Sequence, residues 1–198
     1  MRKKPVLALI AVLFLVSCSA RDFLTRRLAA DLIAASDSFK APQQFVLQTG
    51  LVSNKDYVSP EYLVLQHRGW ISATSAACPA SLVPPPCWDI LLTPSGVDIV
   101  RTLVSGDEAA KSSFALPVAR RELVGITGIS KEGGAADVDF TWRWIPLNEV
   151  GAALYSADLH YKSTVAFRDY DDGWRVVQSN PHSGQPLDDA LKNAEPVP

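Results

Sequence analysis

Cys78 and Cys87 are the residues of this 198-residue chain whose type and spacing best suit a reaction with each other. They stand nine positions apart, and four of the residues between them are prolines. Redox-active pairs usually have a Cys-x-x-Cys spacing at a helix start, whereas a proline-rich loop is stiff and static. The pattern therefore predicts a structural disulfide. Closing so short a loop stabilises a fold by roughly 2.7 kcal/mol in the chain-entropy model.

The remaining groups with acid–base or metal chemistry are dispersed along the chain. Three histidines stand alone, without the spacing of a metal site: His67, His160 and His182. Residues 169–173 have part of a calcium-loop pattern, but a third spaced ligand and a downstream glutamate are missing, which favours a solvated hairpin turn. The sequence thus predicts no catalytic residue, no metal and no cofactor. An enzyme of unrecognised type is the third of three functional hypotheses.

Alternation of apolar and polar residues over 137–144 gives the clearest structural signal, because a period of two is typical of a half-buried strand. The aromatic residues of its apolar face, with one from a later strand, are Phe140, Trp142, Trp144 and Trp174. Two interpretations stay open. The rings fill a core beneath a helix, or they line a groove for a sugar or a peptide, where Asp139 and Arg143 would satisfy hydroxyl groups.

The elements that must position these residues can be predicted from periodicity and from turn residues. Apolar residues at three- and four-residue steps predict a helix over 21–39, and Ser59-Pro60 and Thr93-Pro94 are typical of two further helix starts with a hydroxyl cap. Extended segments are expected at 44–51, 70–75, 88–92, 120–129, 137–144, 162–169 and 174–178. A short helix or turn is expected at 148–154.

The order of these elements predicts an α+β fold. N-terminal helices and a disulfide-stapled β-hairpin would come first, followed by an antiparallel β-sheet packed on a helix. The two regions would span 18–106 and 112–180, with a short linker between them, and one packed domain or two small domains both fit this division. The polar, proline-bearing residues 181–198 are expected to form a loosely held tail.

The first residues have the layout of a secretory signal peptide. Arg2, Lys3 and Lys4 precede an apolar run over 6–16 that is too short to span a bilayer, and small Ser17 stands before Cys18. Removal of residues 1–17 takes these three positive charges away, so the net charge changes from −2 to −5. An acidic body without a basic cluster argues against nucleic acid as a partner. Export also predicts an oxidising compartment, where disulfides persist.

Leu15-Val16-Ser17-Cys18 resembles the lipobox of bacterial lipoproteins. The resemblance implies that Cys18 becomes the first mature residue and carries lipid on its sulfur and its amine, so that the membrane is a partner through this anchor. More than one acyl chain makes such anchoring stable. In that family an aspartate after the cysteine favours retention in the inner membrane. Ser19 stands there instead, which implies the outer membrane, with the protein facing the periplasm.

Two further resemblances concern the fold. Tyr62 to Ile71, followed by a hairpin and Leu92-Thr-Pro-Ser-Gly, resembles the wing region of winged-helix proteins over about 35 residues. In that family the helix and the wing read DNA, but an exported protein would use this shape for protein contact. The last third, with Tyr170-Asp-Asp-Gly-Trp-Arg-Val, resembles the curved sheets of cystatin-like and NTF2-like folds, which cup one face against a helix.

These features predict a lipid-anchored protein of the cell envelope that contacts another envelope protein and has no enzymatic activity. The alternative is a module that binds a small ligand, a sugar or a peptide, on the aromatic sheet face. A partner surface predicts exposed apolar side chains near the stapled hairpin, whereas a ligand site predicts a cavity over Trp142.

Overall fold

The computed structural model describes residues 23–79, 86–104, 112–178 and 184–197. The helices in these segments are α1 Arg26–Ala35, α2 Asp37–Lys40, α3 Asn54–Tyr57, α4 Pro60–His67, α5 Pro94–Leu103, α6 Glu149–Leu154 and α7 Leu187–Lys192. The strands are β1 Gln43–Gln48, β2 Gly50–Ser53, β3 Ile71–Ala76, β4 Cys87–Leu92, β5 Ser113–Glu132, β6 Ala135–Pro146, β7 His160–Tyr170, β8 Gly173–Val176 and β9 Glu195–Val197.

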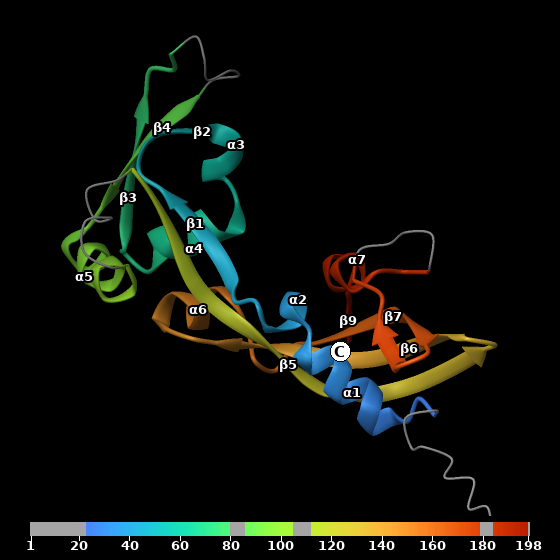
Figure 1. The fold of residues 1–198 in the computed structure, drawn as a ribbon. Coiled ribbons are helices and arrows are strands. Elements are labelled where there is room, and N and C mark those ends of the chain that lie inside the picture. Colours follow the sequence, from blue (N-terminus) through green and yellow to red (C-terminus); the bar gives the residue numbers. More distant parts are fainter. Residues whose placement is uncertain (1–22, 80–85, 105–111, 179–183, 198) are drawn as a thin grey trace, which may run out of the picture.

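The strands form two antiparallel sheets. A six-stranded sheet has the order β1-β5-β6-β7-β8, with β9 pairing to β7, and a three-stranded sheet has the order β2-β4-β3. Figure 1 shows the three-stranded sheet with α3, α4 and α5 at one end of the molecule, and β6, β7 and β8 with α1 and α7 at the other. Helices and curled antiparallel sheet together confirm the α+β class.

The predicted helix starts at Pro60 and Pro94 are confirmed. Thr93 caps α5, since its hydroxyl accepts a hydrogen bond of 3.2 Å from the backbone N–H of Gly96. Ser59 precedes α4 in an extended conformation but makes no capping hydrogen bond with its side chain, so the hydroxyl cap expected there is wrong. The proline at the first turn defines this start, because its fixed φ suits a helix and its missing N–H costs nothing there.

The single helix expected over 21–39 is wrong, because the chain breaks at Ser36. The Ser36 hydroxyl donates to the Ile33 carbonyl at 2.7 Å and accepts from the Phe39 N–H at 3.4 Å. A serine that bonds to nearby backbone groups competes with the helix and starts a new one. Periodicity alone does not reveal this competition, since Ile33 and Phe39 are both buried on either side of the break.

The extended segment expected over 44–51 is divided between the two sheets. β1 pairs with β5, whereas β2 pairs with β4. Gly50 stands at the change of direction with a φ of 76°, a conformation that glycine adopts without steric cost. The chain therefore passes from the six-stranded sheet to the three-stranded sheet at Gly50.

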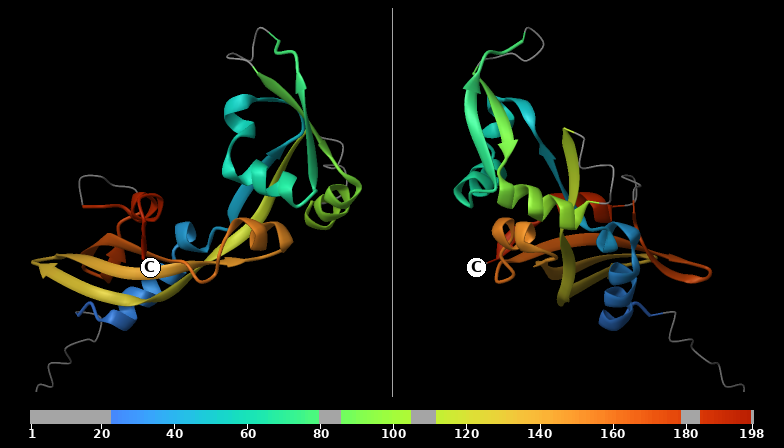
Figure 2. Two further views of the ribbon diagram at one scale, coloured as in Figure 1. Left: turned by 180° about the vertical axis from the view of Figure 1, so that it is seen from behind. Right: turned by 90° about the vertical axis from the view of Figure 1, so that its left-hand side faces the viewer.

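Strand β5 runs between the two ends of the molecule (Figures 1 and 2). Its residues belong to two hydrophobic cores. Its first residues pair with β1 and contribute Phe114, Leu116 and Val118 to a core formed with β1–β4, α3–α6. Its later residues pair with β6 over Ala119–Glu132 and belong to a second core formed with α1, α2, β6–β8 and α7. The cores thus divide the chain differently from the expected regions 18–106 and 112–180, because α1 covers apolar residues of the later strands.

The last residues are held in place, so the loosely attached tail expected over 181–198 is wrong for 184–197. Leu187, Ala190 and Leu191 of α7 are buried in the second core, and β9 pairs with β7. Three apolar residues at helical spacing bury enough surface to fix a short segment. In the sequence, the polar residues and prolines around these three residues make their helical spacing hard to recognise.

Candidate functional site

The predicted disulfide is present. Cys78 and Cys87 are bonded across the connection between β3 and β4, with their Cα atoms 5.2 Å apart. The bond closes the hairpin at the end of the three-stranded sheet, as the spacing predicts. Cys18, the predicted site of lipid attachment, lies outside the described residues.

The aromatic sheet face lies inside the second core. Phe140 is fully buried, and Trp144, the most exposed of the four predicted aromatic residues, is 8 % exposed. Trp142 donates through its indole N–H to the Ser163 hydroxyl at 3.0 Å, and Ser163 in turn donates to a carbonyl of α7 at 2.8 Å. Trp174 is also buried in this core. The rings therefore fill the space beneath α1, α2 and α7. Because they are buried, they do not line an open groove.

Arg121 of β5 is an unexpected member of this aromatic cluster. Its guanidinium carbon lies 4.7 Å from the centre of the Trp144 ring and 5.7 Å from that of Trp142. Its Nη1 donates to the carbonyl of Ser38 at 3.0 Å and to that of Ala41 at 3.3 Å. Arginine combines ring stacking with several donors, which a lysine does not. Arg121 therefore attaches the segment around α2 to the sheet.

The electrostatics of this cluster follow from burial. Burial lowers the pKa of Arg121, while the Asp188 carboxylate acts in the opposite direction. Burial also raises the pKa of the nearby Tyr155 hydroxyl, with Glu61 contributing in the same direction. Nε of Arg121 is buried without a hydrogen-bond partner in the described residues. An arginine held in this way keeps its charge at neutral pH and serves as a structural cation, not as an acid or base.

The other predicted candidates are separate from one another. His67 is exposed on α4 and His160 is part-buried at the start of β7, while His182 lies outside the described residues. Asp172 forms an ion pair with Arg175 at an exposed turn, where Gly173 has a φ of 119°. Within the described segments no three His, Cys, Asp or Glu side chains are placed to hold a metal ion. The turn interpretation of residues 169–173 thus agrees with the geometry.

The outer face of the three-stranded sheet carries a pair of exposed leucines. Leu51 on β2 is 40 % exposed and Leu91 on β4 is 54 % exposed. Leu51 pairs directly with Asp89, two residues from Leu91, so the two leucines are diagonal neighbours on one face. The opposite face of β4 presents Ile90 to the first core. We call this surface, formed by Leu51, Asp89, Leu91, Ser72 and Thr74, the outer leucine face.

Several hollows lie elsewhere on the described surface, and one of about 730 Å³ lies beside Leu63 and His67 of α4 and Ala153 of α6. A mainly apolar cavity of about 330 Å³ lies between α5 and the start of α6, lined by Ile99, Leu103 and their neighbours. A polar one of about 250 Å³ lies between β7 and α7. Its Ser163 and Thr164 hydroxyls are already bonded within the protein, to the Ala190 carbonyl and to Asp139. Neither of these last two hollows gathers a nucleophile with a base, so neither supports a catalytic assignment.

The disulfide should make a measurable contribution to stability. Replacing both Cys78 and Cys87 by serine should lower the free energy of unfolding by about 2.7 kcal/mol, since the unfolded chain regains the entropy of an open loop. Urea denaturation of the two proteins measures this difference. Dithiothreitol should destabilise the native protein by a similar amount and leave the double variant unchanged. Equal stability of the reduced and oxidised native protein would contradict the assignment.

Comparison of the chain with protein-family models, with curated proteins and with solved structures finds no match in any of the three. In the described part of the chain no helix is both long and apolar enough to cross a membrane. The features available to a functional proposal are therefore the disulfide, the outer leucine face and the leader pattern around Cys18.

Proposed function

We propose that this protein is a lipoprotein of the bacterial outer membrane, anchored through Cys18 and facing the periplasm, and that it binds another envelope protein without catalysing a reaction. The anchor is supported by the basic and apolar leader and by the lipobox pattern that ends at Cys18. Acylation would hold the protein on the membrane, and the folded body would then be free to present a binding surface.

The observation that carries the binding proposal is the outer leucine face. Exposed leucines occur singly on many soluble proteins, but here two are neighbours on a sheet that a disulfide closes. Ser72 and Thr74 of β3 flank Leu91 with polar groups on one side, and apolar residues beside a polar rim are typical of a protein interface. A rigid sheet also loses little conformational entropy on binding.

The order of elements supports the related proposal that this end of the molecule is a winged-helix-like module used for protein contact. The short helix α3 precedes α4, the hairpin β3–β4 follows, and β2 pairs with β4. Helix α3 has four residues and lies directly before α4 in the chain. The alternative function, a ligand groove floored by Trp142 and Trp144, loses its support because these rings are buried.

Site-specific crosslinking in cells tests the proposal. A photoreactive amino acid at Leu91 should give one defined crosslinked protein, whereas the same group at Val124, which is 49 % exposed on β5, should not. Leu51→Asp should reduce that product about tenfold, since burying a leucine contributes roughly 1.5–3 kcal/mol and 1.4 kcal/mol is tenfold in affinity. Mass spectrometry of the same preparation should find acyl chains on Cys18. Equal products from both positions, or an unprocessed N-terminus, would refute the proposal.

A further inference from the structure

One end of the molecule combines the entry of the chain with exposed aromatic rings. Leu24 is only 3 % exposed and belongs to the second core, so it fixes the place where the chain enters the folded body. Phe23, the residue before it, is 57 % exposed. The described chain therefore begins with a ring turned toward solvent beside a firmly buried leucine.

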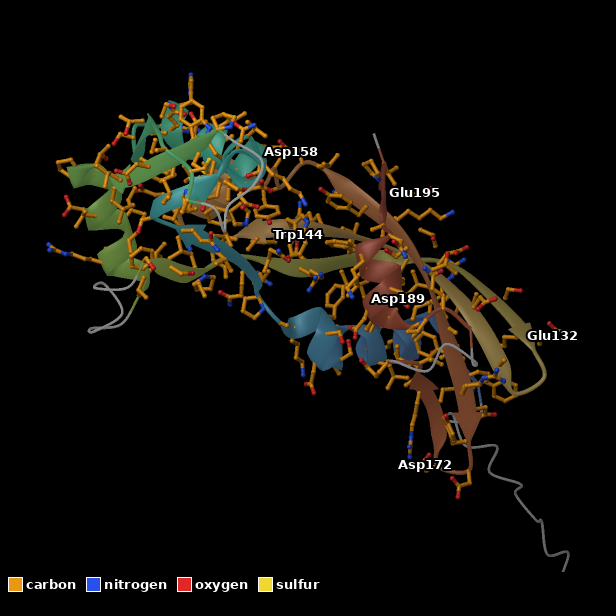
Figure 3. The ribbon with its side chains drawn as sticks, turned by 90° about the horizontal axis from the view of Figure 1, so that it is seen from above. Glu132, Trp144, Asp158, Asp172, Asp189 and Glu195 are labelled. Carbon is orange, nitrogen blue, oxygen red and sulfur yellow. A yellow bond between two sulfur atoms is a disulfide. The ribbon has the colours of Figure 1, made fainter. Side chains whose placement is uncertain are left out.

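Two hairpin turns lie at this same end. The Asp169 N–H donates to the Gly134 carbonyl at 2.9 Å, which joins the β7–β8 hairpin to the β5–β6 turn. Lys131, near the end of β5, lies close to two aromatic rings. Its Nζ is 5.9 Å from the centre of the Phe23 ring and 5.7 Å from the centre of the Trp174 ring. Figure 3 labels Glu132 and Asp172 at these turns, at the end of the molecule away from the three-stranded sheet.

A second ring and cation lie at the β7–β8 turn, on the sheet face opposite Trp174. Tyr170 is 51 % exposed, and the guanidinium carbon of Arg175 lies 5.0 Å from the centre of its ring. We call this end of the molecule, with Phe23, Lys131, Tyr170 and Arg175 on its surface, the entry end. Aromatic rings with neighbouring long cationic side chains are typical of the interface between a membrane and water.

The number of residues before Leu24 limits how far the entry end can lie from an anchor. Leu24 stands six positions after Cys18, and even a fully extended chain of that length spans only about 20 Å. Strand β5 alone has 20 residues and is about 66 Å long at the usual rise of 3.3 Å per residue. If Cys18 is acylated, the entry end is the part of the body that must lie near the bilayer.

We propose that the entry end rests on the phospholipid surface, with Phe23 and Tyr170 in the headgroup region, an orientation that rests on the lipid anchor proposed above. The surface it fits is one without strong net charge, because the cations Lys131 and Arg175 are offset by the acids at 169–172. The lipid anchor attaches the protein to the membrane, and the aromatic rings determine the orientation of the folded body on the membrane surface. The outer leucine face is then turned away from the membrane, toward the periplasm.

Fluorescence of the lipidated mature protein in phosphatidylcholine vesicles tests this orientation. An environment-sensitive dye is attached to a single new cysteine, Tyr170→Cys or Leu91→Cys, two positions of nearly equal exposure. The dye at position 170 should shift to shorter wavelength and be quenched several-fold more strongly by headgroup spin-labelled lipid than the dye at position 91. A third preparation with Phe23→Cys should behave like the protein labelled at position 170.

The outcomes separate the orientation from the anchor. Acylated protein with both dyes in a water-like environment would overturn the orientation and leave the anchor intact. Equal quenching at positions 170 and 91 would also overturn it, since the protein would then lie flat. Mass spectrometry that finds no acyl chain on Cys18 would refute the anchor, and the orientation with it.

Discussion

Replacing Arg121 by alanine should lower the free energy of unfolding by about 3 kcal/mol. The substitution removes hydrogen bonds from a charged donor, each worth roughly 1.5–3 kcal/mol, and ring stacking worth about 0.5–2 kcal/mol. It also leaves the carbonyls of Ser38 and Ala41 without the donor that they share. Chemical denaturation followed by tryptophan fluorescence measures the loss, and Trp142 and Trp144 report directly on the cluster.

Arg120→Ala provides the matched control. Arg120 is the preceding residue of β5 and is exposed, so its loss should change the free energy of unfolding by less than about 0.5 kcal/mol. Arg121→Lys keeps the charge but not the planar fork, and we expect an intermediate loss. Equal stability of the two alanine variants would show that Arg121 does not attach α2 to the sheet.

The contacts of Arg121 could not be predicted from the sequence alone. Alternation over 137–144 was enough to predict that Phe140, Trp142 and Trp144 share one face, because a strand of period two fixes this locally. Nothing local connects Arg121 to residues 38 and 41, which lie about 80 positions earlier. A cation inside an aromatic core needs acceptors such as the Ser38 and Ala41 carbonyls within reach, and their position depends on tertiary structure.

The same distinction explains the elements that were predicted and those that were not. The starts of α4 and α5 follow from proline and its neighbours. The division of residues 43–53 between two sheets depends on which distant strands they meet, β5 or β4. The exposure of Leu51 and Leu91 likewise depends on which face of that sheet the first core covers.

The positions of the entry end and of the outer leucine face could not be predicted from the sequence for a related reason. Phe23, Lys131 and Trp174 come from three distant segments, and only the pairing of β7 with β6 and β8 brings the last two together. The pattern that resembles a lipobox predicts an anchor but says nothing of how the folded body is oriented. The proposed orientation on the membrane follows from the length of β5, because this strand runs between the two ends of the molecule that carry these surfaces (Figure 1).

The junction between the two cores should be highly sensitive to a single added methyl group. A Cβ at Gly151 would lie 1.8 Å from the Val118 carbonyl oxygen and 2.8 Å from its carbonyl carbon. Backbone on both sides prevents relief by a side-chain rotation, because α6 is fixed by Asn148, which donates to the Pro117 carbonyl at 2.6 Å and accepts from the Gly151 N–H at 2.9 Å. Overpacking of this kind costs typically 1–3 kcal/mol, and we expect Gly151→Ala to cost about 3 kcal/mol.

Gly125→Ala is the control, since a Cβ there meets no atom within 4 Å. It lies on β5, the strand that Gly151 packs against, and its substitution should change the free energy of unfolding by less than about 0.5 kcal/mol. Because β5 passes through both cores beside Gly151, the damage should reach both, and hydrogen exchange should accelerate in β4 as well as in β7 of the Gly151→Ala protein. Faster exchange in one core alone would show that the two cores unfold independently and that β5 does not couple them.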